Sequence, residues 1–331
     1  MSITHSRWLA FIFLVTFLLY VGLLSAAENV WFSPCNGADG LSFDSSFEDG
    51  VSILDSSDGK NASISAMSAS KCSENAKSIK SGIRFGKLGI QYEGGGQGER
   101  LAEITSDPLN HLNNVLLFGI QKPNVMGKRG YPVKGRVQMN LYGNKGLKHL
   151  KMSVRLLIPA ELQLLNDYPE RIDWLTISEW WNNAPWTKDL FPFRISVNLY
   201  KEPGKSPLLL QAHAQTYTPS TKIWNQDVWE YVNRDFNIPY GKWMTLEYEF
   251  IEGDKNQGRF YLAVTPDGDK RTVVFDVHNY TYHPEDTEPD GLSHLNPLKL
   301  YTSVKVINYL NSQGSSLRFY WDDLSLQGIP N

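Results

Sequence analysis

The chain has 331 residues and a formal net charge of −3. This overall charge says little about partners, and no known nucleic-acid-binding motif is present, so we expect no nucleic-acid partner. The length is sufficient for one large domain with a substantial core.

Met1–Ala27 has the pattern of a secretory signal peptide. Arg7 supplies the positive start, Leu9–Leu24 is almost wholly apolar, and Ser25–Ala27 offers small residues for cleavage. The apolar run is long for a signal peptide, so an uncleaved membrane anchor is the alternative. We therefore expect a secreted, periplasmic or extracellular protein with a single domain over residues 28–331 and no stable membrane partner.

The chain has two cysteines, Cys35 and Cys72, and both follow the predicted cleavage point. In an oxidising compartment we expect them to form a disulfide, which would stabilise the fold by about 4 kcal/mol in the chain-entropy model. The alternative is two free buried thiols.

Short β-rich runs separated by Gly, Pro, Asn and Asp dominate the rest of the chain, and many of them alternate apolar and polar residues. Antiparallel strands at this spacing predict an all-β jelly-roll β-sandwich with a few short helices. The predicted strands are Val115–Ile120, Gly135–Leu141, His149–Ile158, Trp174–Trp181, Phe193–Tyr200, Leu208–Thr216, Trp243–Glu252, Arg259–Thr265, Thr272–Val277 and Leu317–Leu326. The predicted helices are Ala160–Leu165, Val228–Val232 and Ser303–Ser312.

Basic residues gather between Lys122 and Arg155, a segment with nine Lys or Arg and no Asp or Glu. The field of such a block favours an anionic partner. The alternative is a solvated strand face whose charge is balanced by acids elsewhere in the fold.

Tryptophan is concentrated between Trp174 and Trp186, which hold four of the ten in the chain. Flat aromatic faces beside carboxylate and amide groups are suited to holding sugar rings. We therefore predict Glu179, Trp180, Trp181 and Trp186 as substrate-binding residues. The alternative places two of the four tryptophans in the sandwich core and two in a loop.

Several segments resemble the concanavalin A-like jelly roll. Ser46–Val51 resembles its opening strand, Tyr240–Phe250 its strand that begins with Gly-x-Trp, and Phe319–Leu326 its closing strand. Within that superfamily the chain is most similar to secreted polysaccharide lyases of the alginate and glucuronan lyase type. Gly98–Ser106 resembles their Arg/Glu strand, Trp174–Asn183 stands where they have Gln-x-His, Pro192–Val197 resembles the strand after it, and Leu298–Thr302 resembles their Lys-x-Gly-x-Tyr strand.

The chain departs from the motifs of these lyases. The Gln and His positions hold Glu179 and Trp181, the Arg-x-Glu spacing is stretched to Arg100 and Glu103, and only Lys299 and Tyr301 remain of Lys-x-Gly-x-Tyr. The resemblance to these lyases therefore supports the fold better than it supports the catalytic residues.

A lyase of this kind removes the proton beside a uronate carboxylate and expels the glycosidic oxygen. It needs a base, and it needs cationic or amide groups that stabilise the charge developing on the carboxylate. The resemblance implies Tyr301 as the base, and His213 is its replacement candidate; the alternatives are a core tyrosine and a strand histidine with satisfied hydrogen bonds. The candidate carboxylate neutralisers are Arg100, Arg194 and Asn182, and Lys299 and Glu103 join the predicted substrate-binding residues.

Glu48 with Asp322 or Asp323 is the candidate site for a structural calcium ion. Carbohydrate-active jelly rolls often join their first and last strands through hard oxygen ligands of this kind. The alternative is a surface acid pair at the strand ends. We expect no cofactor to be required for catalysis.

These observations favour a monomeric exported lyase that acts on a uronate-containing anionic polysaccharide. A glycoside hydrolase of the same fold is one alternative, and it would need Glu103 or Asp227 as the carboxylate opposite Glu179. A non-catalytic glycan-binding protein is the other alternative, because it could use the same tryptophans without a base.

Overall fold

The computed structural model describes residues 35–37, 40–48, 50–65, 83–184, 190–218 and 223–329. The predicted signal peptide Met1–Ala27, Cys72 and Trp186 lie outside the described residues, as does the side chain of Cys35. The disulfide therefore stays a prediction. In the described part of the chain, no helix has the length and apolar character needed to cross a membrane.

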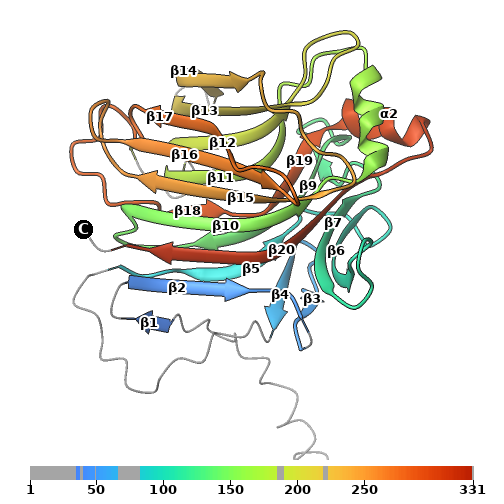
Figure 1. The fold of residues 1–331 in the computed structure, drawn as a ribbon, viewed down its shortest axis with the longest axis horizontal. Coiled ribbons are helices and arrows are strands. Elements are labelled where there is room, and N and C mark those ends of the chain that lie inside the picture. The colour runs from blue at the N-terminus through green and yellow to red at the C-terminus, as the bar shows by residue number, and fades with distance from the viewer. Residues whose placement is uncertain are drawn as a thin grey trace, which may run out of the picture. The chain divides into compact units, whose positions relative to one another are not determined.

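Two antiparallel sheets pack face to face, so the prediction of an all-β jelly-roll sandwich is confirmed (Figure 1). Within the described residues, sheet A has nine strands and sheet B has eleven. Sheet A holds β1 (Cys35–Gly37), β2 (Gly40–Ser45), β6 (Arg100–Ser106), β7 (Asn114–Ile120), β10 (His149–Leu157), β15 (Trp243–Ile251), β16 (Arg259–Pro266), β17 (Thr272–His278) and β20 (Leu317–Gly328). Sheet B holds β3 (Ser52–Asp55), β4 (Asn61–Ser65), β5 (Lys87–Gln91), β8 (Val125–Met126), β9 (Pro132–Tyr142), β11 (Leu175–Asn183), β12 (Phe193–Tyr200), β13 (Leu209–Thr218), β14 (Ile223–Asn233), β18 (His294–Asn296) and β19 (Lys299–Ser303).

The order of the strands in sheet B decides which side chains share a face. The sheet runs β14-β13-β12-β11-β18-β9-β5-β4-β3, with β19 between β11 and β9. Sheet A runs β1-β2-β20-β10-β15-β16-β17, with β7 and β6 beside β20. Strands distant in sequence are therefore neighbours in sheet B, and β11, β18, β19 and β9 form its centre.

The core lies between the two sheets and is rich in aromatic rings. Trp180 of sheet B is fully buried, and its ring lies 5.4 Å from that of Tyr248 and 5.6 Å from that of Phe260 in sheet A, between centroids. In β15 the apolar residues Leu246, Tyr248 and Phe250 are buried while the polar residues between them are part-exposed. This alternation is what directs one face of the strand into the core.

Two of the three predicted helices form. Ala160–Asp167 is a 3₁₀ helix, and α2 (Val304–Ser312) begins where the Ser303 side chain accepts a hydrogen bond from the Val306 amide. The predicted helix Val228–Val232 is wrong, because this segment lies in β14 and pairs with β13. Its few apolar residues do not distinguish a helix from a strand, and pairing with β13 decides between them.

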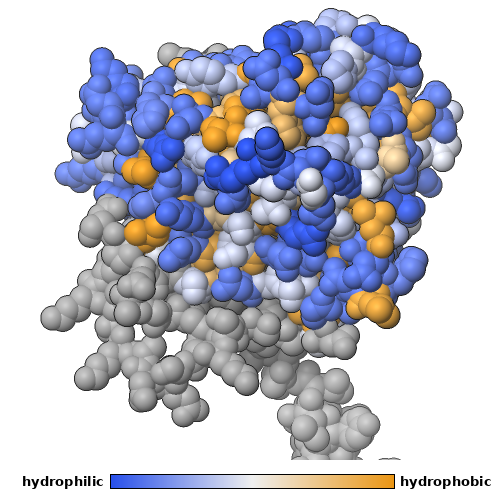
Figure 2. Space-filling model, in the orientation of Figure 1, coloured by the Kyte–Doolittle hydropathy of each residue, from blue (hydrophilic) through white to orange (hydrophobic). Residues whose placement is uncertain are grey.

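The opening strand is displaced from its predicted place. The first long strand of sheet A ends at Ser45, so Ser46–Val51 is not the opening strand that its resemblance implied. Figure 2 shows that hydrophilic side chains cover most of the face seen in the orientation of Figure 1, with smaller groups of hydrophobic residues among them.

A β-bulge interrupts β11 in the middle of sheet B. Thr176 pairs with Asn198 of β12, but the next paired residue, Ser178, is opposite Val197, so β11 has one extra residue. A bulge changes which face the following side chains occupy. Thr176 and Glu179 therefore line the same face of sheet B, although three positions separate them.

Candidate functional site

The face of sheet B turned away from the core lines an open cleft of about 1290 Å³. This volume exceeds the usual range of small-molecule pockets, about 300–1,000 Å³, and fits an extended ligand. The lining residues are Asn61, Gln91, Glu93, Lys134, Arg136, Gln138, Asn140, Tyr142, Gly143, Asp173, Trp174, Thr176, Glu179, Trp181, Arg194, Ser196, Asn198, His213, Gln215, Trp224, His294, Asn296, Lys299 and Tyr301.

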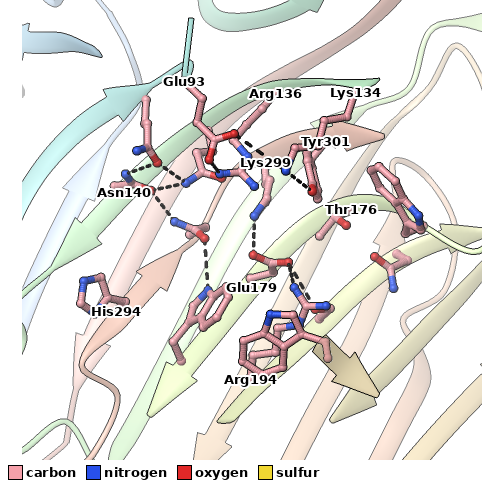
Figure 3. A pocket seen from close by; sticks show the side chains of 18 of the residues that line it. Glu93, Lys134, Arg136, Asn140, Thr176, Glu179, Arg194, His294, Lys299 and Tyr301 are labelled. Carbon is pink, nitrogen blue, oxygen red and sulfur yellow. Dashed lines mark hydrogen bonds and ion pairs between the residues drawn. The ribbon is translucent and has the colours of Figure 1, made fainter. Parts of the chain in front are cut away.

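Glu179 lies on the floor of the cleft and is paired with two cations (Figure 3). The Lys299 ammonium contacts one carboxylate oxygen, and Arg194 Nη1 lies 3.2 Å from the other. Burial acts to raise the pKa of Glu179, but Lys299 and Arg194 outweigh it and lower the pKa to about 2. Glu179 is therefore ionised at neutral pH.

Lys299 is buried with Glu179. Burial lowers the pKa of Lys299 to about 7, while Glu179 opposes this effect and Arg136 adds to it. Both members of the pair are therefore charged between about pH 4.5 and pH 7. This ion pair joins β11 to β19 at the centre of sheet B.

Tyr301 lies next to this pair and has cations around it. Lys134 Nζ donates a hydrogen bond to its hydroxyl oxygen at 2.9 Å. The Arg136 guanidinium lies 4.4 Å from the ring centroid, and Lys299 Nζ lies 4.9 Å from it. The Trp174 ring packs at 4.6 Å between centroids. Aromatic packing and cation–π contacts therefore fix the ring, while its oxygen meets an ammonium group.

Cations exceed acids in the cleft. The described part of its lining contains four cationic side chains, Lys134, Arg136, Arg194 and Lys299. It contains three acidic ones, Glu93, Asp173 and Glu179. Glu93 pairs with Arg136 and lies 3.9 Å from Lys134 Nζ. With its histidines neutral and Lys299 charged, as it is below about pH 7, the lining therefore carries one net positive charge, which favours an anionic ligand.

Amide side chains form a second region of the cleft, beside the cations (Figure 3). Gln138 donates to Gln91 at 2.9 Å and to Asn140 at 2.6 Å, and Asn296 also donates to Asn140. The Trp181 indole donates to Asn296 at 3.3 Å. This amide region lies on β5, β9 and β18 and leads to the tryptophans of β11.

Aromatic rings border the cleft. The Trp224 ring lies 5.2 Å from that of Trp181, and the Arg194 guanidinium lies 4.5 Å from the Trp224 centroid. Tyr142 and His294 stack at 6.1 Å with 17° between their planes. Surfaces of this kind can pack against the apolar faces of sugar rings.

His213 also lines the cleft, on β13 beside Ser196 of β12. Burial lowers the pKa of His213 to about 4, and Arg194 contributes to the shift. His213 is therefore neutral at pH 7, and it is a weaker base than an ordinary histidine.

The structure brings six of the predicted site residues together in the cleft: Tyr301, His213, Arg194, Glu179, Trp181 and Lys299. It places Arg100, Asn182, Trp180 and Glu103 elsewhere, and Trp186 is outside the described residues. Trp180 and Asn182 fall on the opposite face of β11 from Glu179 and Trp181. Trp180 is a core residue, and Asn182 donates to the buried Glu252 at 2.8 Å. Neither contacts the cleft.

Arg100 and Glu103 were predicted at the site because β6 resembles the Arg/Glu strand. That prediction is wrong for this cleft, because β6 belongs to sheet A. Arg100 is buried and pairs with Asp55 at 2.9 Å, and it donates to two backbone carbonyl oxygens. Its charge therefore ties loops together and is not directed at a ligand in the cleft.

The residues predicted to bind calcium differ in their surroundings. Asp322 is buried and accepts a hydrogen bond from Asn113 at 2.9 Å, whereas Asp323 is exposed, and Glu48 lies just beyond β2. Among the described residues, no group of three or more His, Cys, Asp or Glu side chains is placed to hold a metal ion. A structural calcium ion at Glu48 with Asp322 or Asp323 stays a prediction.

The basic block divides between the sheets. Lys134 and Arg136 of β9 face the cleft, but Lys151 and Arg155 of β10 lie in sheet A. Arg155 pairs there with Asp267 at 2.5 Å, so only part of the block can act on a ligand in the cleft.

Sequence reasoning did not single out Lys134, Arg136, Gln138 and Asn140 as site residues. These four alternate along β9 and share the cleft face. Their spacing of two residues in a predicted strand was the signal that could have found them.

No protein-family model and no curated protein sequence matches this chain. Among solved structures, the chain is similar to a mutant of alginate lyase Aly36B in complex with alginate tetrasaccharide, with 12% identity and a TM-score of 0.45 over 87% of this chain and 97% of that one. It is similar to endo-β-1,4-glucuronan lyase from the fungus Trichoderma reesei, with 11% identity and a TM-score of 0.42 over 72% and 93% of the two chains. It is also similar to the exoplasmic/lumenal domain of VIP36, with 11% identity and a TM-score of 0.37 over 73% and 84%. These likenesses do not extend to the roles of individual residues.

Proposed function

We propose that this protein is an exported polysaccharide lyase that cleaves a uronate-containing chain by β-elimination in the cleft of sheet B. The observation that carries the proposal is the Tyr301 hydroxyl, which lies 2.9 Å from Lys134 Nζ among further cations in an open cleft. A proton acceptor beside groups that stabilise anionic charge is what this elimination requires.

The reaction breaks the C5–H bond of the uronate, forms a C4=C5 double bond and breaks the C4–O glycosidic bond. Tyr301 acts as a phenolate, which takes the C5 proton and becomes neutral. The hydrogen bond from Lys134 stabilises the phenolate before the transfer, because a hydrogen bond is stronger to a charged oxygen than to a neutral one. Arg136 stabilises the charge that develops on the uronate carboxylate. The proton on Tyr301 then passes to the departing oxygen, which leaves as a hydroxyl group and returns Tyr301 to the phenolate, so charge and atoms balance.

A hydrolase is less well supported by the same cleft. Its general acid must be protonated near neutral pH and therefore needs a raised pKa. Glu179 has the opposite shift, because Lys299 and Arg194 lower its pKa to about 2. Glu103 and Asp227 do not supply the second carboxylate that a hydrolase needs. Glu103 lies in sheet A, and Asp227 is exposed and accepts a hydrogen bond from Gln215.

The proposal is tested by incubating the protein with anionic and neutral polysaccharides and measuring both ultraviolet absorbance of unsaturated uronate and new reducing ends. We expect both signals from a uronate-containing polysaccharide, with binding that weakens as salt is added because cations in the cleft attract the chain. Reducing ends without absorbance would indicate a hydrolase. Binding without cleavage of any member would indicate a glycan-binding protein.

Replacing His213 by Gln is expected to leave kcat within about tenfold of the wild-type value, whereas loss of a proton-transfer group costs about 10²–10⁴-fold. The reason is that His213 has a pKa lowered to about 4 and Tyr301 is the proposed base. Initial rates on the best substrate of the panel measure this effect. A fall of a hundredfold or more would transfer the role of base to His213.

A further inference from the structure

The loop that carries Glu93 into the cleft is fixed to Arg136 by a buried amide. Asn124 is 4% exposed, and its Nδ2 donates to the carbonyl oxygens of Tyr92 at 2.8 Å and Gly94 at 3.0 Å. The same side chain donates to the carbonyl oxygen of Arg136 at 3.1 Å and accepts from the Arg136 amide at 2.9 Å. Asn124 therefore connects the backbone on both sides of Glu93 to the backbone of Arg136.

A second buried side chain, that of Arg100, supports the same loop. Its guanidinium carbon lies 3.4 Å from the centroid of the Tyr92 ring, and its Nη2 donates to the Gly95 carbonyl oxygen at 3.2 Å. Tyr92 also donates to Asp55, the ion-pair partner of Arg100, at 2.9 Å. A Cβ atom at Gly95 would lie 2.7 Å from Asn124 Cβ, so a side chain there would push the loop away from its support. The loop is therefore held on both sides of Glu93.

Glu93 itself has a backbone conformation that costs free energy. Its φ is 65°, in the left-handed region that residues with a Cβ atom rarely adopt. Strain of this kind persists where the surrounding structure imposes it, and it is concentrated at functional sites. The strain and the two buried supports together fix the Glu93 carboxylate at one place in the cleft.

That place lies between two of the cations near Tyr301 (Figure 3). One Glu93 carboxylate oxygen contacts Arg136 Nη1, and the other lies 3.9 Å from Lys134 Nζ. These are the cations whose guanidinium lies 4.4 Å from the Tyr301 centroid and whose ammonium donates to the Tyr301 hydroxyl oxygen at 2.9 Å. Lys134 and Arg136 repel each other, and long side chains adopt many rotamers when nothing holds them. An acid that contacts both therefore restrains them together.

We propose that Glu93 is a positioning residue for the elimination, whose carboxylate holds Arg136 and Lys134 at the reaction centre. This inference rests on the proposed function and adds to it a residue that need not contact the substrate. Glu93 acts through the two cations, because charges that are already in place stabilise a transition state better than charges that must first be ordered.

The charge of Glu93 separates positioning from simple attraction. Replacing Glu93 by Gln adds one unit to the net positive charge of the lining, so an effect of charge alone would tighten the binding of an anionic chain and leave kcat unchanged. Loss of positioning has the opposite signature, because kcat falls while the dissociation constant does not rise.

The test compares Glu93→Gln with Asp173→Asn, which removes the same charge from the lining of the cleft. Asp173 pairs with Arg171 at 2.6 Å, so this variant leaves Arg136 and Lys134 with their acid. We expect kcat on the best substrate of the panel to be about 10–100-fold lower in Glu93→Gln than in Asp173→Asn, the usual cost of a misplaced catalytic group. Calorimetry, with Tyr301→Phe added to each variant to prevent cleavage, should show that neither change weakens binding.

Crystal structures of the wild-type protein and both variants test the geometry without a substrate. We expect the Arg136 guanidinium to keep its place over the Tyr301 ring in the wild-type protein and in Asp173→Asn, and to leave that place in Glu93→Gln. An Arg136 and a Lys134 that do not move in Glu93→Gln would overturn the inference.

The kinetic outcomes separate this inference from the proposed function. If the wild-type protein is a lyase and Glu93→Gln has the kcat of Asp173→Asn or a higher one, the proposed function stands and the inference fails. Weaker binding by Glu93→Gln with an unchanged kcat would make Glu93 a substrate contact and would also overturn the inference. If the wild-type protein forms no unsaturated product from any polysaccharide, the proposed function fails first, and the inference fails with it.

Discussion

Replacing Tyr301 by Phe is expected to lower kcat by about 10²–10⁴-fold while the dissociation constant for substrate stays almost unchanged. The substitution removes the hydroxyl oxygen that Lys134 contacts at 2.9 Å. It keeps the ring that packs on Trp174 at 4.6 Å and lies near Arg136 at 4.4 Å, so the shape of the cleft is retained. Steady-state rates measure the first effect, and calorimetry measures the second.

A matched control for this substitution is Tyr309→Phe. Tyr309 lies on α2, outside the lining of the cleft, and its hydroxyl donates to the Leu164 carbonyl oxygen at 3.2 Å. Tyr309→Phe should keep the wild-type kcat. If Tyr301→Phe retains more than about a tenth of the wild-type kcat, Tyr301 is not the proton acceptor.

Replacing Lys299 by Met is expected to destabilise the fold by about 1–3 kcal/mol. This is less than the roughly 3–5 kcal/mol for a buried charge left wholly unpaired, because Arg194 still contacts Glu179 at 3.2 Å. Lys299 and Glu179 have side chains that are each 2% exposed, so solvent cannot replace the lost ammonium group. Urea unfolding followed by tryptophan fluorescence measures the change in unfolding free energy.

The pH of that measurement matters. Glu179 has a pKa lowered from its ordinary 4.5 to about 2, so its contribution to stability is fully present above about pH 4.5 and is lost as the pH falls towards 2. Lys299 has a pKa lowered to about 7, so it is mostly charged below that value. A measurement near pH 6 therefore compares the intact ion pair with the broken one.

Two controls show whether burial is the cause. Lys305→Met breaks the ion pair with Glu170, whose side chains are 65% and 54% exposed, and should leave the unfolding free energy almost unchanged. The double change Glu179→Gln with Lys299→Met removes both charges of this pair. It should recover part of the lost stability, and not all of it, because Arg194 also loses its carboxylate partner and keeps only its hydrogen bonds to Gln215. A loss below about 1 kcal/mol for Lys299→Met alone would contradict the structural role of this pair.

The fold could largely be predicted from the sequence because apolar and polar residues alternate along its strands. In β15, Leu246, Tyr248 and Phe250 mark the buried face in the printed sequence as clearly as in the structure. The strand structure of Val228–Val232 could not be predicted in the same way. Its place in β14 depends on pairing with β13, and a short apolar run carries no information about a partner distant along the chain.

The site was predicted only in part, and Arg100 illustrates the reason. A local motif shows that an arginine occupies a strand, but not to which sheet the strand belongs. β6 joins sheet A, and Arg100 pairs with Asp55, which lies 45 residues earlier in the sequence. Lys134 and Arg136 were overlooked for a related reason, because the charge of the whole segment was considered and the face of each side chain was not.

The bulge in β11 has an evolutionary consequence. Because one extra residue stands between Thr176 and Ser178, a single-codon deletion there would restore regular pairing with β12. Thr176 would still pair with Asn198 and Glu179 with Ser196, so both would keep their place on the cleft face. A loss or gain of one residue between Ser178 and Trp181, where pairing with β12 is regular, would instead turn the side chains beyond it to the other face of the sheet. The bulge is therefore a position where this strand can change length without changing the lining of the cleft.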